Sequence, residues 1–285
     1  MSQFDWWIIE NKTHLEIIDI LNLHKERRPW VNYFMNESLM SPGNLNSVCR
    51  IGYVPFSNCK QNRFYYLDQS RYIETIAAGG ICTEIDWDST PENLPEGWQG
   101  SVRRAYLESK TDEKKPNTIV ALLAFTLSRY RKNGFSGKVI SKMCIYGKEI
   151  GYDYCIIPTL PPTQFQKPYI DMPVNEIAQL KRDDGNYYDY WLRLHTQKGA
   201  QIIGTHSKSH RFVFSIQDFS KYVSSCPVNT SGEHLVTLDK DLSLGKNGEN
   251  MWQKVYVNIE QDIVQFDWGC IWVQYDLKKL EFKPG

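Results

Sequence analysis

The stretch from Arg129 to Ser141, RYRKNGFSGKVIS, combines basic side chains with two glycines where a strand should pass into a helix. It directly follows the apolar run IVALLAFTLS, and Gly134 and Gly137 stand where the helix should begin. Glycine lets the backbone approach another molecule closely, and the first turn of a helix offers N–H groups without intrahelical partners to an anion. The residue types and their order therefore predict an anion-binding turn.

Two common phosphate-binding patterns are absent from this stretch. Gly134, Gly137 and Lys138 do not have the spacing of GxxxxGK[ST], and no GxGxxG is present. The arrangement Arg131-x-x-Gly134-x-Ser136 resembles the R/Q-x-x-G-x-G/A signature with which GNAT acyltransferases hold the pyrophosphate of acyl-CoA. A glycine C-cap or a tight turn with solvated basic residues is the alternative interpretation.

Further sequence blocks occur in the order in which one GNAT subgroup carries them. The subgroup includes stand-alone bacterial N-acetyltransferases and is similar to GNAT-type loading domains that initiate polyketide assembly lines. The resemblance covers about residues 25–245. Its blocks are WVNYFMNES near Trp30, WDSTPENLPEGW, RKNGFS, IPTLPPTQFQKPY, DGNYYDYWLRLHTQKGAQIIG and SGEHLVTLD.

The resemblance implies acyl-CoA, as acetyl-CoA or malonyl-CoA, as co-substrate. Backbone N–H groups of the turn would hold the pyrophosphate, and the splayed strand beside it would pair with pantetheine. By position, the coenzyme-binding residues would be Leu127, Arg131, Lys132, Asn133, Gly134, Phe135, Ser136 and Gly137.

Two side chains are implied to do chemistry. In the loading domains, a threonine and a histidine are held responsible for decarboxylating malonyl-CoA, and by motif match they fall on Thr163 in LPPT and His195 in YWLRLH. A hydroxyl and an imidazole can hydrogen-bond a carboxylate or a thioester oxygen, and the histidine can return a proton to the enolate that CO2 leaves behind. The same two groups can instead orient an amine nucleophile.

Each of these residues also has a structural interpretation. His195 near the end of a helix can be a satisfied histidine whose charged form the helix dipole favours, and Thr163 after two prolines can be a turn residue. A general base for an amine could also come from Glu84 or Asp86 at a strand end.

Two further residues are predicted to face the substrate. Arg211 stands where the loading domains carry a basic residue thought to do so, with a solvated arginine as the alternative. Trp191 is expected first to pack its helix on the sheet and second to form a wall of the substrate site. Late in the chain, Tyr275 in WGCIWVQY stands where the subgroup pattern has a histidine, and this departure concerns the acceptor side.

The elements that must position these residues alternate between strand and helix. Helices are predicted over 13–25, 101–110, 137–152 and 189–199, the last one closed by Gly199. Strands are predicted over 63–68, 72–85 with a break at Gly79–Gly80, 118–128, 153–160 and 200–206, and short β pieces over 234–239, 254–259 and 270–277.

This alternation predicts an α/β (α+β) protein with a mixed sheet. The resemblance implies the GNAT fold, a twisted mixed β-sheet with helices on both faces, in which the coenzyme enters where two central parallel strands splay apart. We expect one domain over 1–285, with a core of about 12–220, the acyl-CoA site near 118–142 and a C-terminal β-rich extension over about 221–285.

Charge and motif content narrow the classes of function. The 33 basic and 33 acidic side chains cancel, which argues against nucleic-acid binding. We expect a cytoplasmic protein without a membrane span, because the first residues lack a basic n-region and no apolar run is long enough to span. His206 and His210 have i, i+4 spacing but no helix and no third ligand, so no metal site is predicted.

The first functional hypothesis is therefore an acyl-CoA-dependent acyltransferase that moves acetyl or another short acyl group to an amine or a carrier-protein thiol. The implied partner is a small-molecule amine or an acyl-carrier protein. A malonyl-CoA-type decarboxylase that loads an assembly line is the first alternative, and a non-catalytic module that binds CoA or a carrier protein is the second.

Overall fold

A computed structural model describes residues 4–10, 62–68, 75–109, 111, 113, 115–126, 130–220, 223, 226, 229–238 and 251–280. The helix predicted over 13–25 and the coenzyme residue Leu127 lie outside this described part. None of the helices within it is both long enough and apolar enough to cross a bilayer.

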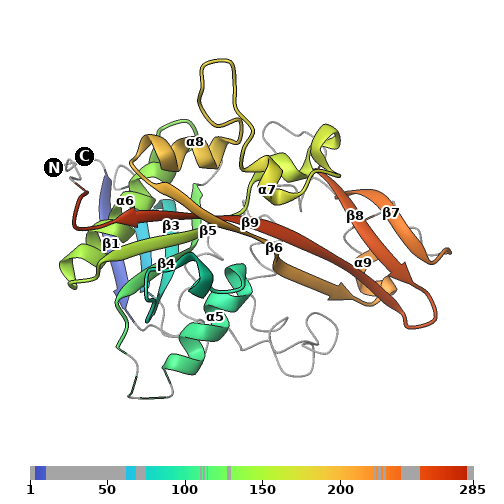
Figure 1. The fold of residues 1–285 in the computed structure, drawn as a ribbon, viewed down its shortest axis with the longest axis horizontal. Coiled ribbons are helices and arrows are strands. Elements are labelled where there is room, and N and C mark those ends of the chain that lie inside the picture. Colours follow the sequence, from blue (N-terminus) through green and yellow to red (C-terminus); the bar gives the residue numbers. More distant parts are fainter. Residues whose placement is uncertain are drawn as a thin grey trace.

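Nine strands form one mixed sheet in the order β1-β2-β3-β4-β5-β9-β8-β7, and β6 pairs with β9 beside this path (Figure 1). The pair β4–β5 is parallel, and the other strand pairs of the described residues are antiparallel. The strands are β1 Phe4–Glu10, β2 Asn62–Asp68, β3 Thr75–Ile85, β4 Thr118–Thr126, β5 Tyr154–Thr159, β6 Gln201–Phe214, β7 Gly232–Leu238, β8 Met251–Asn258 and β9 Ile263–Asp276.

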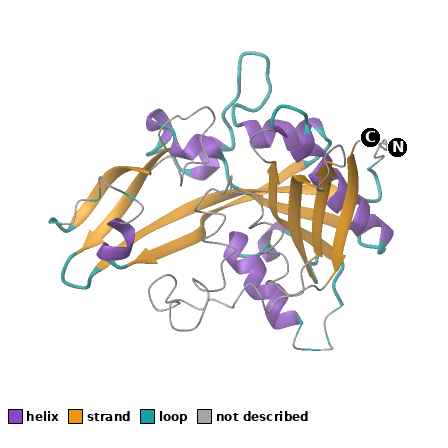
Figure 2. Cartoon of the chain, turned by 180° about the vertical axis from the view of Figure 1, so that it is seen from behind, coloured by secondary structure: helices purple, strands orange, loops and turns teal. Residues whose placement is uncertain are grey.

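Helices cover both faces of the sheet. Successive residues of a strand point to opposite faces, so one strand can contact helices on both sides. On β5, Cys155 packs in the apolar cluster that includes Val139 of α6, whereas Ile156 packs in the cluster that includes Val102 of α5. The predicted α/β class, with a mixed sheet between helices, is thus confirmed (Figure 2). The helices are α5 Gly97–Glu108, α6 Phe135–Glu149, α7 Val174–Ile177, α8 Tyr190–Gln197 and α9 Ile216–Ser220, with 3-10 turns η2 Pro91–Asn93, η4 Pro162–Phe165 and η5 Lys167–Tyr169.

Glycines let α6 lie close to the sheet. The predicted break at Gly79–Gly80 is wrong, because β3 runs through both residues. A Cβ at Gly80 would lie 2.6 Å from Val139 Cγ1 and 2.8 Å from the Leu123 carbonyl oxygen, and would also clash with Met143. Gly80 therefore serves close packing of α6 and not a turn.

The C-terminal strands belong to the centre of the sheet as well as to its far end. β9 pairs with β6 along both halves of its length, and its opposite edge pairs with β5 over 271–276 and with β8 over 263–265. We call the part formed by β7, β8 and the adjoining halves of β6 and β9, on the right of Figure 1, the wing. β6 is longer than predicted, so His206 and His210 both lie on a strand. The wing encloses its own apolar cluster, which contains Phe165, Phe212, Phe214, Phe219 and Trp268.

Gly80→Ala should destabilise the fold by about 1–3 kcal/mol, because the added methyl overpacks the interface between β3 and α6. As a single substitution, Met143→Ala should also destabilise the fold, because it leaves a cavity. Combined, the two substitutions should cost less than the sum of the single effects, measured by chemical denaturation. Additive costs would contradict the packing of α6 on Gly80.

Candidate functional site

The parallel pairing of β4 with β5 stops early. Only Thr118–Tyr154, Ile119–Cys155 and Val120–Ile156 are paired. Beyond them, β4 stays paired with β3 up to Thr126, and β5 stays paired with β9 up to Thr159. The two strands therefore diverge toward their carboxyl ends, as the resemblance predicted, and their facing backbone groups are left for another extended molecule.

The glycine turn lies between β4 and α6. Gly134 is the N-cap of α6 with a φ of 72°, in the left-handed region, and a Cβ there would meet no atom within 4 Å. No side chain caps the helix, and its first turn begins with the hydrogen bond of 3.2 Å from Lys138 N–H to the Gly134 carbonyl. A side chain at Gly134 would thus enter open space, and α6 begins without a side-chain cap, which suits an anion.

Apolar anchors hold this turn in place. Phe135 and Tyr130 are buried, with ring centroids 6.3 Å apart. The Asn133 amide donates to the Tyr130 carbonyl at 3.2 Å, and the hydroxyls of Ser136 and Thr126 are 3.0 Å apart. These contacts therefore fix the turn to the end of β4, while Arg131 and Lys132 are exposed.

Lys198 is a cation at this turn that sequence reasoning missed. It follows α8, and its side chain crosses Gly137: a Cβ at Gly137 would lie 2.7 Å from Lys198 Cε and 3.4 Å from Lys198 Nζ. Lys198 Nζ also donates to Ser141 Oγ at 3.4 Å. The second glycine of the motif thus lies against the end of this lysine side chain, a contact between residues 61 positions apart that no local pattern indicates.

Asp189 joins the two segments that carry the predicted catalytic residues. Its buried carboxylate caps α8 by accepting from Trp191 N–H at 2.9 Å and Leu192 N–H at 3.3 Å. It also accepts from Thr163, from the hydroxyl at 2.8 Å and from the backbone N–H at 3.2 Å. Burial raises the pKa of Asp189, and these hydrogen bonds oppose that rise.

The bond to Asp189 limits what Thr163 can do. A hydroxyl has one donor and two acceptor positions, and the donor of Thr163 is directed at Asp189. Thr163 is buried in η4 with its remaining lone pairs available to an incoming N–H group. A substrate oxygen without a proton would have to displace Asp189.

His195 lies in a buried aromatic setting near the other end of α8. Its Nδ1 is 2.8 Å from the Tyr275 hydroxyl, and the Trp191 ring stacks on it at 5.9 Å between centroids. Burial, and secondarily the charge of Lys198, lowers the pKa of His195 to about 4. The interpretation that the helix dipole favours its charged form is therefore wrong, because desolvation outweighs the dipole.

Thr163 and His195 do not hydrogen-bond each other; each has its own partner. Thr163 meets the start of α8 through Asp189, and His195 comes six residues later, about 9 Å along a helix axis. Thr163 is therefore attached to the start of α8, and His195 lies in the last turn of the same helix. The departure from the subgroup pattern at Tyr275 thus lies beside His195.

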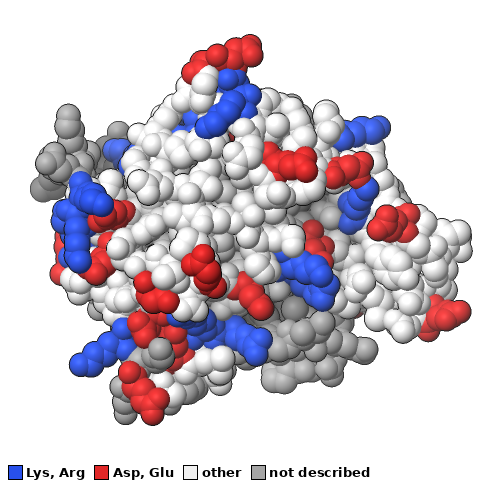
Figure 3. Space-filling view, in the orientation of Figure 1, with Lys and Arg blue, Asp and Glu red and all other residues white. Residues whose placement is uncertain are grey.

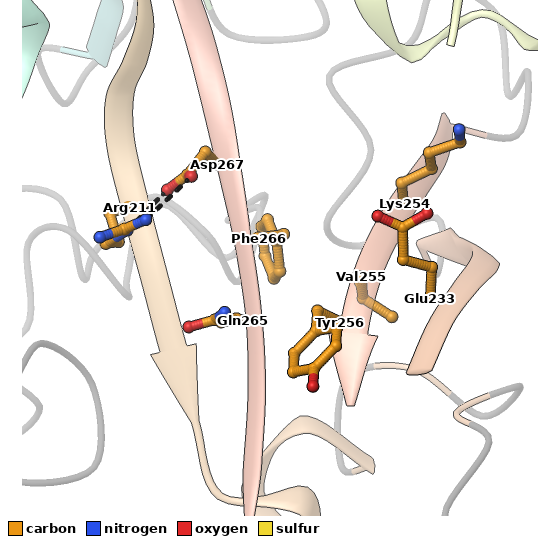
Figure 4. Close-up of a pocket in the computed structure, with 8 residues that line it drawn as sticks. All are labelled: Arg211, Glu233, Lys254, Val255, Tyr256, Gln265, Phe266 and Asp267. Carbon is orange, nitrogen blue, oxygen red and sulfur yellow. Dashed lines mark hydrogen bonds and ion pairs between the residues drawn. The ribbon is translucent and has the colours of Figure 1, made fainter. Parts of the chain in front are cut away.

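Arg211 and Glu84 lie away from the site formed by the glycine turn and α8. Arg211 forms a two-pronged ion pair with Asp267, at 3.0 and 3.3 Å, beside a hollow of about 180 Å³ in the wing (Figure 4). Asp267 precedes Tyr275 by eight residues on β9, about 26 Å along a strand. Glu84 accepts from the Tyr152 hydroxyl at 2.8 Å and pairs with Ile119 near the start of β4, at the end away from the glycine turn.

Charged side chains of both signs are interspersed on the face of the molecule seen in Figure 3. Among the described residues, no group of three or more His, Cys, Asp or Glu side chains is arranged to hold a metal ion.

A curated protein matches part of the chain. Over 159 residues the chain is 25% identical to the arginine N-acetyltransferase avaD of Aspergillus versicolor. The match covers 53% of each protein, so the chain spans about half the length of the curated relative it matches. No protein-family model matches the chain.

Similar solved structures carry GNAT names. The loading GNATL domain of CurA from Lyngbya majuscula is 14% identical with a TM-score of 0.44, over 97% of this chain and 100% of that one. The GphF GNAT-like decarboxylase in complex with isobutyryl-CoA is 12% identical with a TM-score of 0.47, over 95% and 99%. The proteins that this chain resembles are thus GNAT acyltransferases, as its sequence blocks indicated.

Asp189→Ala should lower the free energy of unfolding by about 2–4 kcal/mol, because it removes a helix cap and leaves the buried Thr163 groups without their acceptor. The matched control is Asp184→Ala, whose exposed carboxylate accepts from Asn186 N–H in the preceding hairpin. The control should cost under about 1 kcal/mol in the same denaturation experiment. Equal costs would contradict the role of Asp189 in joining η4 to α8.

Proposed function

We propose that this protein transfers a short acyl group, acetyl in the simplest case, from acyl-CoA to an amine. The observation that carries the proposal is the early end of β4–β5 pairing next to the open, Gly134-capped start of α6. A pantetheine chain is an extended, amide-bearing ligand that can bond the free strand edge, and a pyrophosphate is an anion that suits the helix start. The two features lie at successive points of one chain segment.

In this proposal the turn from Arg131 to Gly137 and the cation of Lys198 hold the phosphates. The thioester then lies in the opening between β4 and β5, within reach of α8. The amine nitrogen forms a C–N bond to the thioester carbonyl carbon as the C–S bond breaks. One proton leaves the nitrogen, and one reaches the sulfur of CoA. Positioning and polarisation of the carbonyl supply the rate enhancement.

The state of Thr163 favours an amine over a carboxylate. Its hydroxyl proton is engaged by Asp189, so the hydroxyl is prepared to accept from an N–H group and not to donate to an oxygen. Decarboxylation of malonyl-CoA, as predicted for this pair of residues, would ask the same hydroxyl to donate. The name of the curated relative, an arginine N-acetyltransferase, supports an amine acceptor as well.

Acetyl-CoA incubated with the protein and a panel of amines, arginine and polyamines included, should release CoA and yield an acylated amine in mass spectrometry. His195→Ala should lower kcat about 100-fold or more, because a preorganised polar group at the carbonyl is lost. Thr163→Val should mainly raise KM for the amine.

Malonyl-CoA alone, run in parallel, decides between the alternatives. Its conversion to acetyl-CoA without acceptor would replace the transferase proposal by the decarboxylase. Acyl transfer to a carrier-protein thiol alone would replace the amine as acceptor. Tight CoA binding without turnover on any substrate would indicate a binding module.

Lys198→Ala should weaken CoA binding about 5- to 20-fold by calorimetry, and pantetheine binding should not change, because only the phosphates face the lysine. The matched control is Lys254→Ala, which removes the same charge from an ion pair with Asp171 in the wing. Equal affinities of the two variants for CoA would contradict phosphate binding by Lys198.

A further inference from the structure

We propose that Tyr275 positions His195 as a neutral imidazole with its proton on Nε2, so that His195 acts in the site as an N–H donor and not as a general base. The inference rests on the proposed function for the identity of the group that receives this hydrogen bond. The position of the proton itself rests on the hydrogen bond between Tyr275 and His195 and on the burial of both side chains.

The Tyr275 side chain has a restricted choice of partners. It is fully buried on β9, opposite Cys155 of β5, and its hydroxyl lies 2.8 Å from His195 Nδ1. Within the described part of the chain this is the hydrogen bond found for the phenol. Burial raises the pKa of Tyr275, so the phenol keeps its proton. A buried O–H that lacks an acceptor is costly, and His195 Nδ1 is the acceptor within reach.

The direction of this bond determines the tautomer. A neutral imidazole carries one N–H and one lone pair on its two ring nitrogens. If the phenol donates to Nδ1, the lone pair is on Nδ1 and the proton is on Nε2. The reverse arrangement, with Nδ1–H donating to the phenol oxygen, would leave the phenol proton without an acceptor among the described residues. Tyr275 therefore selects the Nε2–H form.

The neighbours of His195 keep the ring neutral. Lys198, directly after α8, is the charged group that acts on it, and its sign opposes a second proton on the ring. Near the Tyr275 hydroxyl, α6 and β5 contribute the buried thiols of Cys144 and Cys155, and α8 contributes the indole of Trp191 on the other side of the imidazole. No carboxylate among the described residues is paired with His195, so nothing compensates an imidazolium there.

The consequence for the reaction is specific. With its lone pair occupied by Tyr275, His195 cannot take a proton from the amine without losing this bond. Its Nε2–H can donate to the thioester oxygen, where negative charge grows as the amine attacks. The proton of the amine must leave to another acceptor or to water.

The experiment is long-range ¹⁵N–¹H correlation NMR of the full chain, with the His195 signals assigned by comparison with His195→Gln. The wild-type ring should show the Nε2–H tautomer from pH 5.5 to 8, with protonation only near pH 4. Tyr275→Phe should shift His195 toward the Nδ1–H form. The matched control is Tyr152→Phe, which removes the phenol bonded to Glu84 and should leave the His195 spectrum unchanged.

Kinetics separates positioning from a structural role. Tyr275→Phe should lower kcat about 10-fold or more, with KM for acyl-CoA changed less than about 2-fold, whereas Tyr152→Phe should change neither. A wild-type ring in the Nδ1–H form, or one that titrates near pH 6.5, overturns the proposal, and this result is read on the wild-type ring itself. Absence of turnover on every amine would overturn the proposed function, while the NMR result would still decide the tautomer.

Discussion

The site depends on the early end of the β4–β5 ladder. Three parallel pairs hold the centre of the sheet together, and beyond Val120 and Ile156 each strand is held by its other neighbour. The sheet can therefore open at its centre without losing strand order. Because α6 is the helix that follows β4 after the glycine turn, the opening between β4 and β5 and the start of α6, which has no side-chain cap, lie side by side. An extended ligand with an anionic end matches both features.

Helix α8 holds two of the buried polar groups of the candidate site. It begins with the buried carboxylate of Asp189 and carries the buried imidazole of His195, two groups that burial opposes in their charged forms. Asp189 is compensated by four hydrogen bonds, and His195 stays neutral beside Tyr275. The short helix is thereby tied to η4 at one end and to β9 at the other.

Much of this arrangement could be predicted from local signals. The strand at 118–126, the helix that follows Gly134 and the helix that carries His195 each show in the apolar spacing, and the glycine turn indicates its own position. Local signals failed where a distant contact decides. In the sequence, Gly80 resembles a strand break and Gly137 resembles part of a phosphate-binding loop. In the structure, α6 packs on Gly80, and the Lys198 side chain lies against Gly137. Asp189, directly before an apolar-periodic run, is a helix-cap signal in the sequence, and it is the N-cap of α8 in the structure.

The sequence by itself determined the class of fold, the position of the glycine turn and the candidates Thr163 and His195, because these follow from spacing and motif order within short stretches. The tertiary structure decided what the candidates can do. Thr163 became an acceptor because Asp189 takes its proton, and His195 became neutral because its ring is buried against Tyr275. Protonation state and hydrogen-bond direction depend on the dielectric surroundings and on partners 26 and 80 residues away, and no local pattern encodes those.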